Sequence, residues 1–443
     1  MRYALTFVAL LFSVRHIGIR LLPILNGFMA KHVCSAIFVS RRALAEVRNS
    51  ELRIRLFRLP AIEIDLAQKW VQVSLWGLGA RAAFYHAERG CILCKQSPLP
   101  GSRSTAQHRL ALQRTEILQP KENFPVDFSP DITSWMETQP APTLAVCALH
   151  RDRIIAEQYR PGISPDTSLP GWSMAKSVMN ALVGILVKQG RLDLHEPLPA
   201  RLWQGAQTGR TNITMHHLLQ MSSGLSWTER YWWSSDVTNM LFNSEDVSHS
   251  ITTKPCRAQP GRRFQYASGT TNAISKALRY LLGDEYPAFP YQYLFEPLGM
   301  HTALMETDAA GHFVGSSFML ASARDWSKFG LLYLQDGMWN GENILPQGWV
   351  AYTRSPAPAA PAREYGAHFW LNLGEEEQPE TRKMPNVSAD VYYASGFGGQ
   401  RLFIVPTYDL VIVRLGAAHF TEPDFNLLLS HFLAEFEKNK RKF

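Results

Sequence analysis

Segments typical of buried β-strands occur at both ends of the long C-terminal part of this chain. Residues 143–150 are almost entirely apolar, and the run 154–159 follows after a short turn. Near the C-terminus, residues 402–405 and 410–415 flank another short turn. Two strands joined in this way pair antiparallel. We therefore expect one antiparallel sheet that is built from the two ends of this region.

Helical periodicity fills the region between these strands. From Ser173 onward, apolar residues recur at spacings of three and four up to Gly190, which is typical of one helix packed on a core and ended by glycine. We expect an α+β fold, with an antiparallel sheet flanked by helices and a helical lobe inserted between its two halves. The pattern places further helices at 215–221, 271–282, 321–336 and 425–438.

The N-terminal part divides into smaller pieces. Ile62–Asp65 and Trp70–Leu75 alternate apolar and polar residues, which predicts a hairpin with one buried face. Pro, Gly and Ser residues after this unit indicate a linker. The division that we expect is an apolar leader or anchor at 1–31, a small β-rich unit at 32–95, a linker at 96–122 and the α+β domain at 123–443.

The first residues have the pattern of an export or anchoring segment. Arg2 precedes Tyr3–Val14, a run of 12 residues that is too short to span a bilayer and suits the apolar region of a signal peptide. A second apolar stretch, Ile17–Ala30, follows. We expect the protein to be exported, or anchored in a membrane on its extracytoplasmic side. The alternative is that translation starts further along the chain.

Composition narrows the possible partners. Apolar residues make up 46% of the chain and charged residues 19%, as in globular proteins. The net charge of +7 is dispersed, and basic residues are not interleaved with aromatic ones, so we expect no nucleic-acid partner. A basic flank beside a membrane surface is the better interpretation. The sequence carries no signal for the oligomeric state.

The five cysteines predict a cross-link rather than a metal site. Cys91 and Cys94 form a CxxC, but no second pair or histidine cluster completes a zinc site, so we expect neither a metal nor another cofactor. A small exported unit with little core would gain from a disulfide. We expect it between Cys34 and Cys91, with Cys94 as the rival partner and Cys147 as a buried thiol.

Ser173 and Lys176 are the first candidate catalytic pair. Their spacing of three places the hydroxyl and the amine about one turn apart on the same helix face. A serine becomes a good nucleophile when a neighbour accepts its proton, and a lysine kept neutral by burial can do so. Because an apolar helix follows Lys176, we expect its side chain to be enclosed. A helix start with a solvated lysine would show the same S-x-x-K spacing, so further motifs must decide.

Two further motifs follow in order, and together the three resemble a known superfamily. Tyr266-Ala267-Ser268 precedes a predicted helix, and Ala394–Gln400, a small-residue motif, precedes the final hairpin. Serine β-lactamases and penicillin-binding proteins carry S-x-x-K, then Y-x-N or Y-x-S, then a small-residue motif on a late strand. The resemblance implies a β-lactamase-like fold. It covers about residues 125–435 and includes the flanking stretches 213–225 and 329–337.

Within this superfamily the chain is most similar to class C β-lactamases, family VIII esterases and 6-aminohexanoate-dimer hydrolases. The resemblance implies a serine hydrolase in which Ser173 attacks a carbonyl and forms an acyl-enzyme. Lys176 and Tyr266 would then act as general base and acid, and which of them takes the proton first stays open. The resemblance also implies an oxyanion hole from the backbone N–H groups of Ser173 and Phe397. Supporting roles fall to Ser268, as a hydrogen-bond partner of Lys176, and to Ser395 and Gly396.

One position departs from the pattern of β-lactamases and penicillin-binding proteins. Those proteins usually begin the late-strand motif with a lysine, whose cation helps to hold a carboxylate, and Ala394 stands there in this chain. An anionic β-lactam would lose a charge-assisted contact of about 1.5–3 kcal/mol. We therefore expect hydrolysis of small ester or amide substrates. The alternative is a penicillin-binding or β-lactam-sensing module that is acylated but slow to turn over.

Other polar residues have plainer interpretations. We expect His216 and His217 to serve packing or the surface, and Asp236 and Glu245 to lie in a solvated loop. The natural substrate is not readable from the motifs, because the loops 226–260 and 354–390 set it. The aromatic candidates for the acyl side of a pocket are Trp232, Trp233 and Tyr365.

Overall fold

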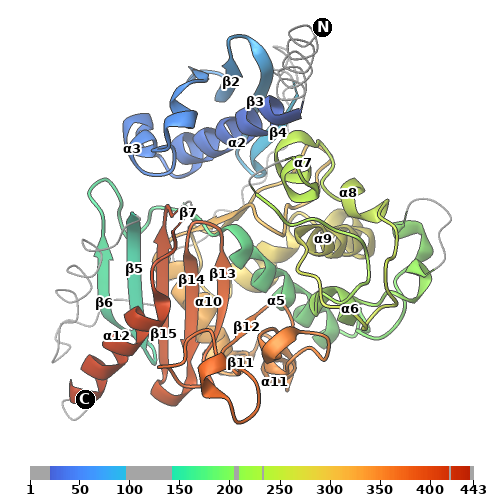
Figure 1. The fold of residues 1–443 in the computed structure, drawn as a ribbon, viewed down its shortest axis with the longest axis vertical. Coiled ribbons are helices and arrows are strands. Elements are labelled where there is room, and N and C mark those ends of the chain that lie inside the picture. The colour runs from blue at the N-terminus through green and yellow to red at the C-terminus, as the bar shows by residue number, and fades with distance from the viewer. Residues whose placement is uncertain (1–19, 96–141, 204–208, 232–233, 419–420, 440–443) are drawn as a thin grey trace, which may run out of the picture.

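A six-stranded antiparallel sheet forms the centre of the large domain (Figure 1). Its strand order is β12-β13-β14-β15-β5-β6, so the C-terminal hairpin pairs with the first strand of the domain. The expected sheet, built from both ends of the domain, is confirmed. Its strands are β5 (Thr143–His150), β6 (Arg153–Tyr159), β12 (Trp370–Leu371), β13 (Tyr392–Gly396), β14 (Gln400–Val405) and β15 (Leu410–Gly416).

This computed structural model describes residues 20–95, 142–203, 209–231, 234–418 and 421–439. The expected linker at 96–122 lies outside the described residues. So do Trp232 and Trp233, and the first part of the expected leader.

Helices cover both faces of the sheet, because successive side chains of a strand point to opposite faces. Leu402 and Val413 belong to the larger core, which also holds apolar residues of α5 and α10. Phe403 and Ile412 point the other way, into a second core with residues of α12. The covering helices are α5 (Ala175–Lys188), α10 (Ala323–Leu334) and α12 (Phe425–Asn439).

The lobe inserted between the two halves of the sheet is mainly helical, as expected, and lies to one side of the sheet in Figure 1. Its helices are α6 (Met215–Leu219), α7 (Asp236–Asn243), α8 (His249–Thr252) and α9 (Ser268–Leu282). The remaining strands and the remaining α-helix of the large domain are short. They are β7 (Leu169–Pro170), β8 (Leu304–Met305), β9 (Met319–Ala321), β10 (Met338–Trp339), β11 (Glu342–Asn343) and α11 (Trp349–Arg354).

The N-terminal unit is a four-stranded antiparallel sheet with a helix packed on one face. Helix α2 (Leu22–Cys34) buries Met29 and Val33 against Val71 and Val73, the apolar positions of the expected hairpin. The short helix α3 (Leu44–Asn49) follows α2. The strands are β1 (Ala61–Asp65), β2 (Trp70–Leu75), β3 (Leu78–His86) and β4 (Gly90–Cys94).

The expected boundary at residue 31 falls inside α2. By length and composition, the segment Leu22–Val39 could cross a membrane, as a signal sequence or the core helix of a soluble protein also could. In the structure 72% of that segment is buried, because its apolar face completes the core of the N-terminal sheet. We therefore propose that the N-terminal unit begins at or before Leu22.

Cys34 of α2 and Cys91 of β4 are completely buried and free. Burial raises the pKa of the Cys34 thiol, and a hydrogen bond with Cys91 adds to this rise. The expected disulfide is wrong for this structure, although the two side chains do meet. The expectation assumed a hairpin with little core, whereas α2 and two further strands supply one. Cys91 and Cys94 stand three apart on a strand and point to opposite faces, so they cannot share a metal ion.

A buried ion pair joins the N-terminal unit to the large domain. Lys31 of α2 pairs with Glu306, and neither side chain is more than 5% exposed. Glu306 also accepts hydrogen bonds from Ser35 Oγ at 2.9 Å and from the backbone N–H of Cys91 at 2.7 Å. The Lys31 amine lies 4.4 Å from the ring centroid of Phe318. These contacts compensate both charges for their removal from water.

Glu306→Ala should lower the free energy of unfolding by about 3–5 kcal/mol, because it leaves the Lys31 ammonium buried without its partner. Chemical denaturation measures this loss. The control is Glu376→Ala, whose carboxylate is 81% exposed in its pair with Arg363 and should cost less than about 1 kcal/mol. Similar losses for the two variants would contradict the stabilising role given to the buried pair.

Candidate active site

Ser173 lies in a single 3-10 turn, Trp172–Met174, that leads directly into α5. Its side chain is partly exposed, whereas Trp172 and Met174 on either side are buried. Trp172 has a left-handed backbone with φ of 49°. Such a conformation costs a bulky residue roughly 1–3 kcal/mol and persists only where the surroundings enforce it. The turn thus presents one hydroxyl at the edge of a tightly packed core.

The Lys176 amine lies at the centre of a polar cluster. Its Nζ is 2.9 Å from Ser173 Oγ, 3.1 Å from Ser268 Oγ and 3.0 Å from the carbonyl oxygen of Ser316. The hydrogen bond expected with Ser268 is therefore present, and the side chain is enclosed as expected, with 1% exposed. Burial lowers the pKa of Lys176 to about 8, and the charge of Glu229 opposes this shift. Near pH 8 a large fraction of the amine is neutral.

Tyr266 lies just before α9 and faces the same serine. Burial raises the pKa of its phenol, the charge of Glu229 adds to this, and a hydrogen bond with Ser173 opposes it. The Lys176 Nζ lies 4.9 Å from the Tyr266 ring centroid. The ring also contacts Tyr365, a candidate pocket residue, with 6.0 Å between centroids. Tyr266 is thus a protonated phenol between the serine and an aromatic wall.

Glu229 is a site residue that the sequence analysis missed. Its carboxylate accepts hydrogen bonds from Ser268 Oγ at 2.5 Å and from the Ser268 backbone N–H at 3.0 Å. The indole N–H of Trp227 donates to it at 2.5 Å. The carboxylate therefore holds Ser268, which in turn holds Lys176. No motif or periodicity marks a lone glutamate in an irregular loop, so the sequence offered no signal for it.

The late strand β13 ends beside the nucleophile turn. A Cβ atom on Gly396 would lie 2.2 Å from the carbonyl oxygen of Gly171, so only glycine allows this approach. Phe397 follows directly, and its ring centroid is 5.1 Å from that of Trp172. The structure thus brings the expected oxyanion-hole residues, Ser173 and Phe397, onto two neighbouring segments.

Two side chains that the sequence analysis did not single out hold the turn after Phe397. Gln400 Nε2 donates to the carbonyl oxygen of Phe397 at 3.0 Å. Arg414, which is completely buried, donates to the carbonyl oxygens of Gly398 at 2.9 Å and Gly399 at 2.8 Å. Buried donors on consecutive carbonyl groups restrict how this turn can move.

The position expected to lack a cation is apolar and enclosed. Ala394 is 1% exposed in β13, and Ser395 beside it is partly exposed. Arg401 lies opposite Ser395 in β14. Its guanidinium pairs with Glu422 and lies 4.3 Å from the ring centroid of Phe425. The Arg401 charge is therefore already engaged within the protein.

His368 supports Lys176 from behind and was also missed. Its Nδ1 lies 3.0 Å from the carbonyl oxygen of Lys176, and its Nε2 lies 3.2 Å from Thr271 Oγ1. Burial lowers the pKa of His368 to about 3, and the Lys176 charge adds to the shift. The neutral ring therefore ties α5 to α9.

The other polar candidates have structural contacts. The expected loop position is wrong for Asp236, which is the first residue of α7, whereas Glu245 is exposed in the loop after that helix. His217 completes the N-terminal cap of α6, and His216 Nδ1 lies 3.0 Å from the Tyr352 hydroxyl. Asp236 pairs with a lysine through a contact of 2.5 Å, and Glu245 accepts a backbone N–H at 3.2 Å.

Among the described residues, one group could hold a metal ion. Ligand atoms of Asp246, Asp308 and His312 lie within 4.8 Å of one another. Both carboxylates already accept backbone N–H groups, Asp246 from Ser248 and Asp308 from Val247, each at 2.9 Å. The two carboxylates therefore hold the backbone of this loop through hydrogen bonds, and we assign no metal to them.

The candidate catalytic residues Ser173, Lys176 and Tyr266 lie within a region that matches a known protein family. The sequence profile of the β-lactamase family matches residues 131–428, which is more than half of the chain. The chain belongs to the β-lactamase family. Within this β-lactamase-family chain, the N-terminal unit at residues 20–95 lies outside the matched region.

One relative resembles the chain in sequence, and two solved structures resemble it in fold. The 6-aminohexanoate-dimer hydrolase of Paenarthrobacter ureafaciens is 26% identical over 296 residues, which cover 64% of this chain and 74% of that protein. A β-lactamase from Mycobacterium bovis is 17% identical with a TM-score of 0.51 and covers 69% of this chain and 98% of its own. EstA from Arthrobacter nitroguajacolicus Rue61a is 16% identical with a TM-score of 0.53 and covers 69% and 94%.

These comparisons confirm the expected superfamily and the β-lactamase-like fold. The protein is a β-lactamase-family hydrolase.

Proposed function

We propose that the protein hydrolyses its substrate through an acyl-enzyme on Ser173, with Lys176 and Tyr266 as the proton-transfer groups. The observation that carries this proposal is the 2.9 Å contact between Lys176 Nζ and Ser173 Oγ, made by an amine whose pKa burial lowers to about 8. A neutral amine accepts the serine proton as the oxygen attacks the carbonyl carbon. The carbonyl oxygen of Ser316 then stabilises the ammonium that forms.

Tyr266 is suited to the opposite proton transfer. Its raised pKa keeps the phenol protonated, and Ser173 lies close enough to the phenol to affect that pKa. The phenol donates to the leaving alcohol or amine as the acyl bond to Ser173 forms, and it recovers the proton from the Lys176 ammonium. Water then attacks the acyl-enzyme by the reverse sequence, which releases the acid and restores the serine hydroxyl.

The backbone N–H groups of Ser173 and Phe397 form the proposed oxyanion hole. Ser173 lies at the start of the helical segment, where the helix dipole favours negative charge. The close approach of Gly396 to Gly171 supports the placement of the second donor. Losing one donor of this kind typically costs about 10²- to 10³-fold in rate.

The proposed substrates are small neutral esters or amides. Ala394 offers no charge, and the Arg401 guanidinium is engaged by Glu422, so neither can bind a substrate carboxylate. The relative from Paenarthrobacter ureafaciens is named for hydrolysis of a 6-aminohexanoate dimer. That name supports amide cleavage by the present chain.

We also propose that the protein acts outside the cytoplasm or at a membrane. Helix α2 gives no support for this proposal, since it packs as a core helix. The support comes from the apolar run Tyr3–Val14, which follows Arg2. Cell fractionation is the test, and a purely cytoplasmic protein would refute the proposal.

Ser173→Ala should abolish nearly all turnover of a nitrophenyl ester and leave the thermal unfolding temperature unchanged, because only the attacking oxygen is removed. Steady-state kinetics and calorimetry measure the two quantities. Retention of a tenth of the wild-type rate would exclude Ser173 as the nucleophile. In the wild type, a single stoichiometric burst with a trapped adduct would instead favour the penicillin-binding or sensing alternative.

The kcat/KM should rise as the pH increases through about 8 and then level off, because the neutral Lys176 amine is the active form and burial sets its pKa there. Glu229→Gln should move the midpoint to lower pH, because the Glu229 charge raises that pKa. Glu285→Gln, a distant exposed carboxylate paired with Arg191, is the control and should leave the midpoint in place. A midpoint that moves to higher pH in Glu229→Gln would contradict this electrostatic account.

A neutral short-chain ester or amide should have a higher kcat/KM than benzylpenicillin, because neither Ala394 nor the paired Arg401 offers a free cation to the penicillin carboxylate. Initial rates for a panel of neutral esters, short amides and β-lactams measure the order. A penicillin value above that of every neutral substrate would refute the proposed preference.

A further inference from the structure

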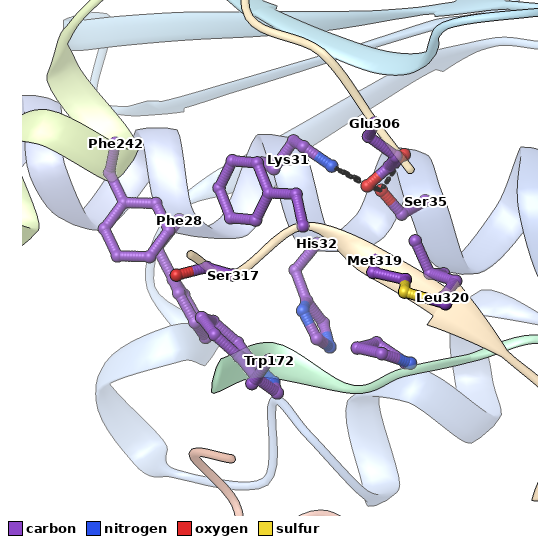
Figure 2. Close-up of a pocket in the computed structure, with 12 residues that line it drawn as sticks. Phe28, Lys31, His32, Ser35, Trp172, Phe242, Glu306, Ser317, Met319 and Leu320 are labelled. Atoms are coloured by element: carbon purple, nitrogen blue, oxygen red, sulfur yellow. Dashed lines mark hydrogen bonds and ion pairs between the residues drawn. The ribbon is translucent and has the colours of Figure 1, made fainter. Parts of the chain in front are cut away.

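Helix α2 of the N-terminal unit lies against Trp172, in the turn that carries the proposed nucleophile (Figure 2). Phe28 and His32, one turn apart on α2, both stack on the Trp172 indole. The centroid distances are 6.2 Å and 6.0 Å, and both interplanar angles are 19°. Phe28 and His32 also stack on each other at 5.5 Å. Two rings from outside the family region thus cover the residue next to Ser173.

The indole is enclosed on its other sides by rings of the large domain. Phe242 of α7 contacts it with 6.4 Å between centroids, and Phe397 after β13 contacts it with 5.1 Å. The residue with the left-handed backbone is therefore held by four rings, and two of them belong to α2. Without that packing, an ordinary backbone conformation would be favoured at Trp172.

The two rings cannot withdraw independently, because α2 is held to the large domain at Gly27 and at Lys31. Lys31, between Phe28 and His32 in the sequence, makes the buried pair with Glu306. At Gly27, a Cβ atom would lie 2.0 Å from the carbonyl oxygen of Phe242, so the backbones of α2 and α7 touch. A small cavity lies beside these residues and is also lined by Met319 (Figure 2).

We propose that the N-terminal unit positions the nucleophile: Phe28 and His32 hold the Trp172 indole and, through it, the backbone and hydroxyl of Ser173. This inference rests on the proposed function, because it takes Ser173 as the attacking group. Phe28 and His32 act through Trp172, so they are positioning residues and not catalytic ones. The family profile begins at residue 131. In this proposal, a unit outside the family region therefore contributes to the positioning of the nucleophile.

Single-turnover acylation by p-nitrophenyl acetate tests the proposal. Phe28→Ala and His32→Ala should each lower the acylation rate constant at least about tenfold, since displacement of a reacting group by 1 Å can cost about 10²-fold. KM should stay within about twofold, and the pH midpoint should not move, because the pKa of Lys176 is set by its burial and by the Glu229 charge, and neither variant replaces a residue in contact with these groups. His32→Phe, which keeps a ring without its titratable nitrogens, should restore the rate.

Phe38→Ala is the matched control. Phe38 is a partly buried ring of the same unit that packs on Tyr85, with 6.1 Å between centroids, and makes no ring contact with Trp172. It should lose comparable stability and keep the wild-type acylation rate. Assays are run below the unfolding temperature of each variant. Phe28→Leu, which keeps apolar volume without a stacking face, replaces Phe28→Ala if the latter does not fold.

Three outcomes decide the matter. Slow acylation in the Phe28 and His32 variants with normal acylation in Phe38→Ala supports the proposal. Unchanged rates in the folded Phe28 and His32 variants overturn it, and so does an equal loss in Phe38→Ala. The proposed function is judged separately by Ser173→Ala. If that variant is inactive while Phe28→Ala is fast, only the positioning role fails.

Discussion

The enclosure of one lysine amine is the constraint on which the rest of this site depends. An amine that is removed from water must find hydrogen-bond partners, become partly deprotonated through a lowered pKa, or both. Lys176 does both, with partners from Ser173, Ser268 and Ser316 and a pKa lowered to about 8. Those partners come from three distant parts of the chain, so the large domain must be folded before the amine can be held. His368 and Glu229 add a further layer, one behind the backbone of Lys176 and one behind Ser268.

The turn that carries the nucleophile is also held by segments that are distant in the sequence. The late strand reaches the turn only because Gly396 has no side chain there, and the following loop is held by Gln400 and the buried Arg414. From the other side, α2 presses two rings on Trp172 while an ion pair prevents its withdrawal. The strained turn is thus enforced by elements from both ends of the chain, which is how an unfavourable backbone conformation persists in a folded protein.

Much of this arrangement could be predicted because it depends on local patterns. The sheet built from both ends of the domain follows from two hairpin patterns and their positions in the chain, and the pairing of β15 with β5 confirms it. The spacing of Ser173 and Lys176 survives as a contact because three residues make about one helical turn. The N-terminal unit was harder. Two alternating segments showed a hairpin, but the apolar stretch before it resembled a leader, and only the packed structure shows that it completes a core.

By itself, the sequence determined the fold class, the order of the three motifs and the absence of a cation at Ala394, since each depends on residue type and short spacing. Only the tertiary structure decided that Glu229 and His368 support the site, that Cys34 and Cys91 meet as free thiols, and that α2 covers Trp172. These contacts join residues far apart in the chain through irregular loops or across two units. No periodicity encodes such contacts, because they arise from shape and burial in the folded molecule rather than from the pattern of any one segment.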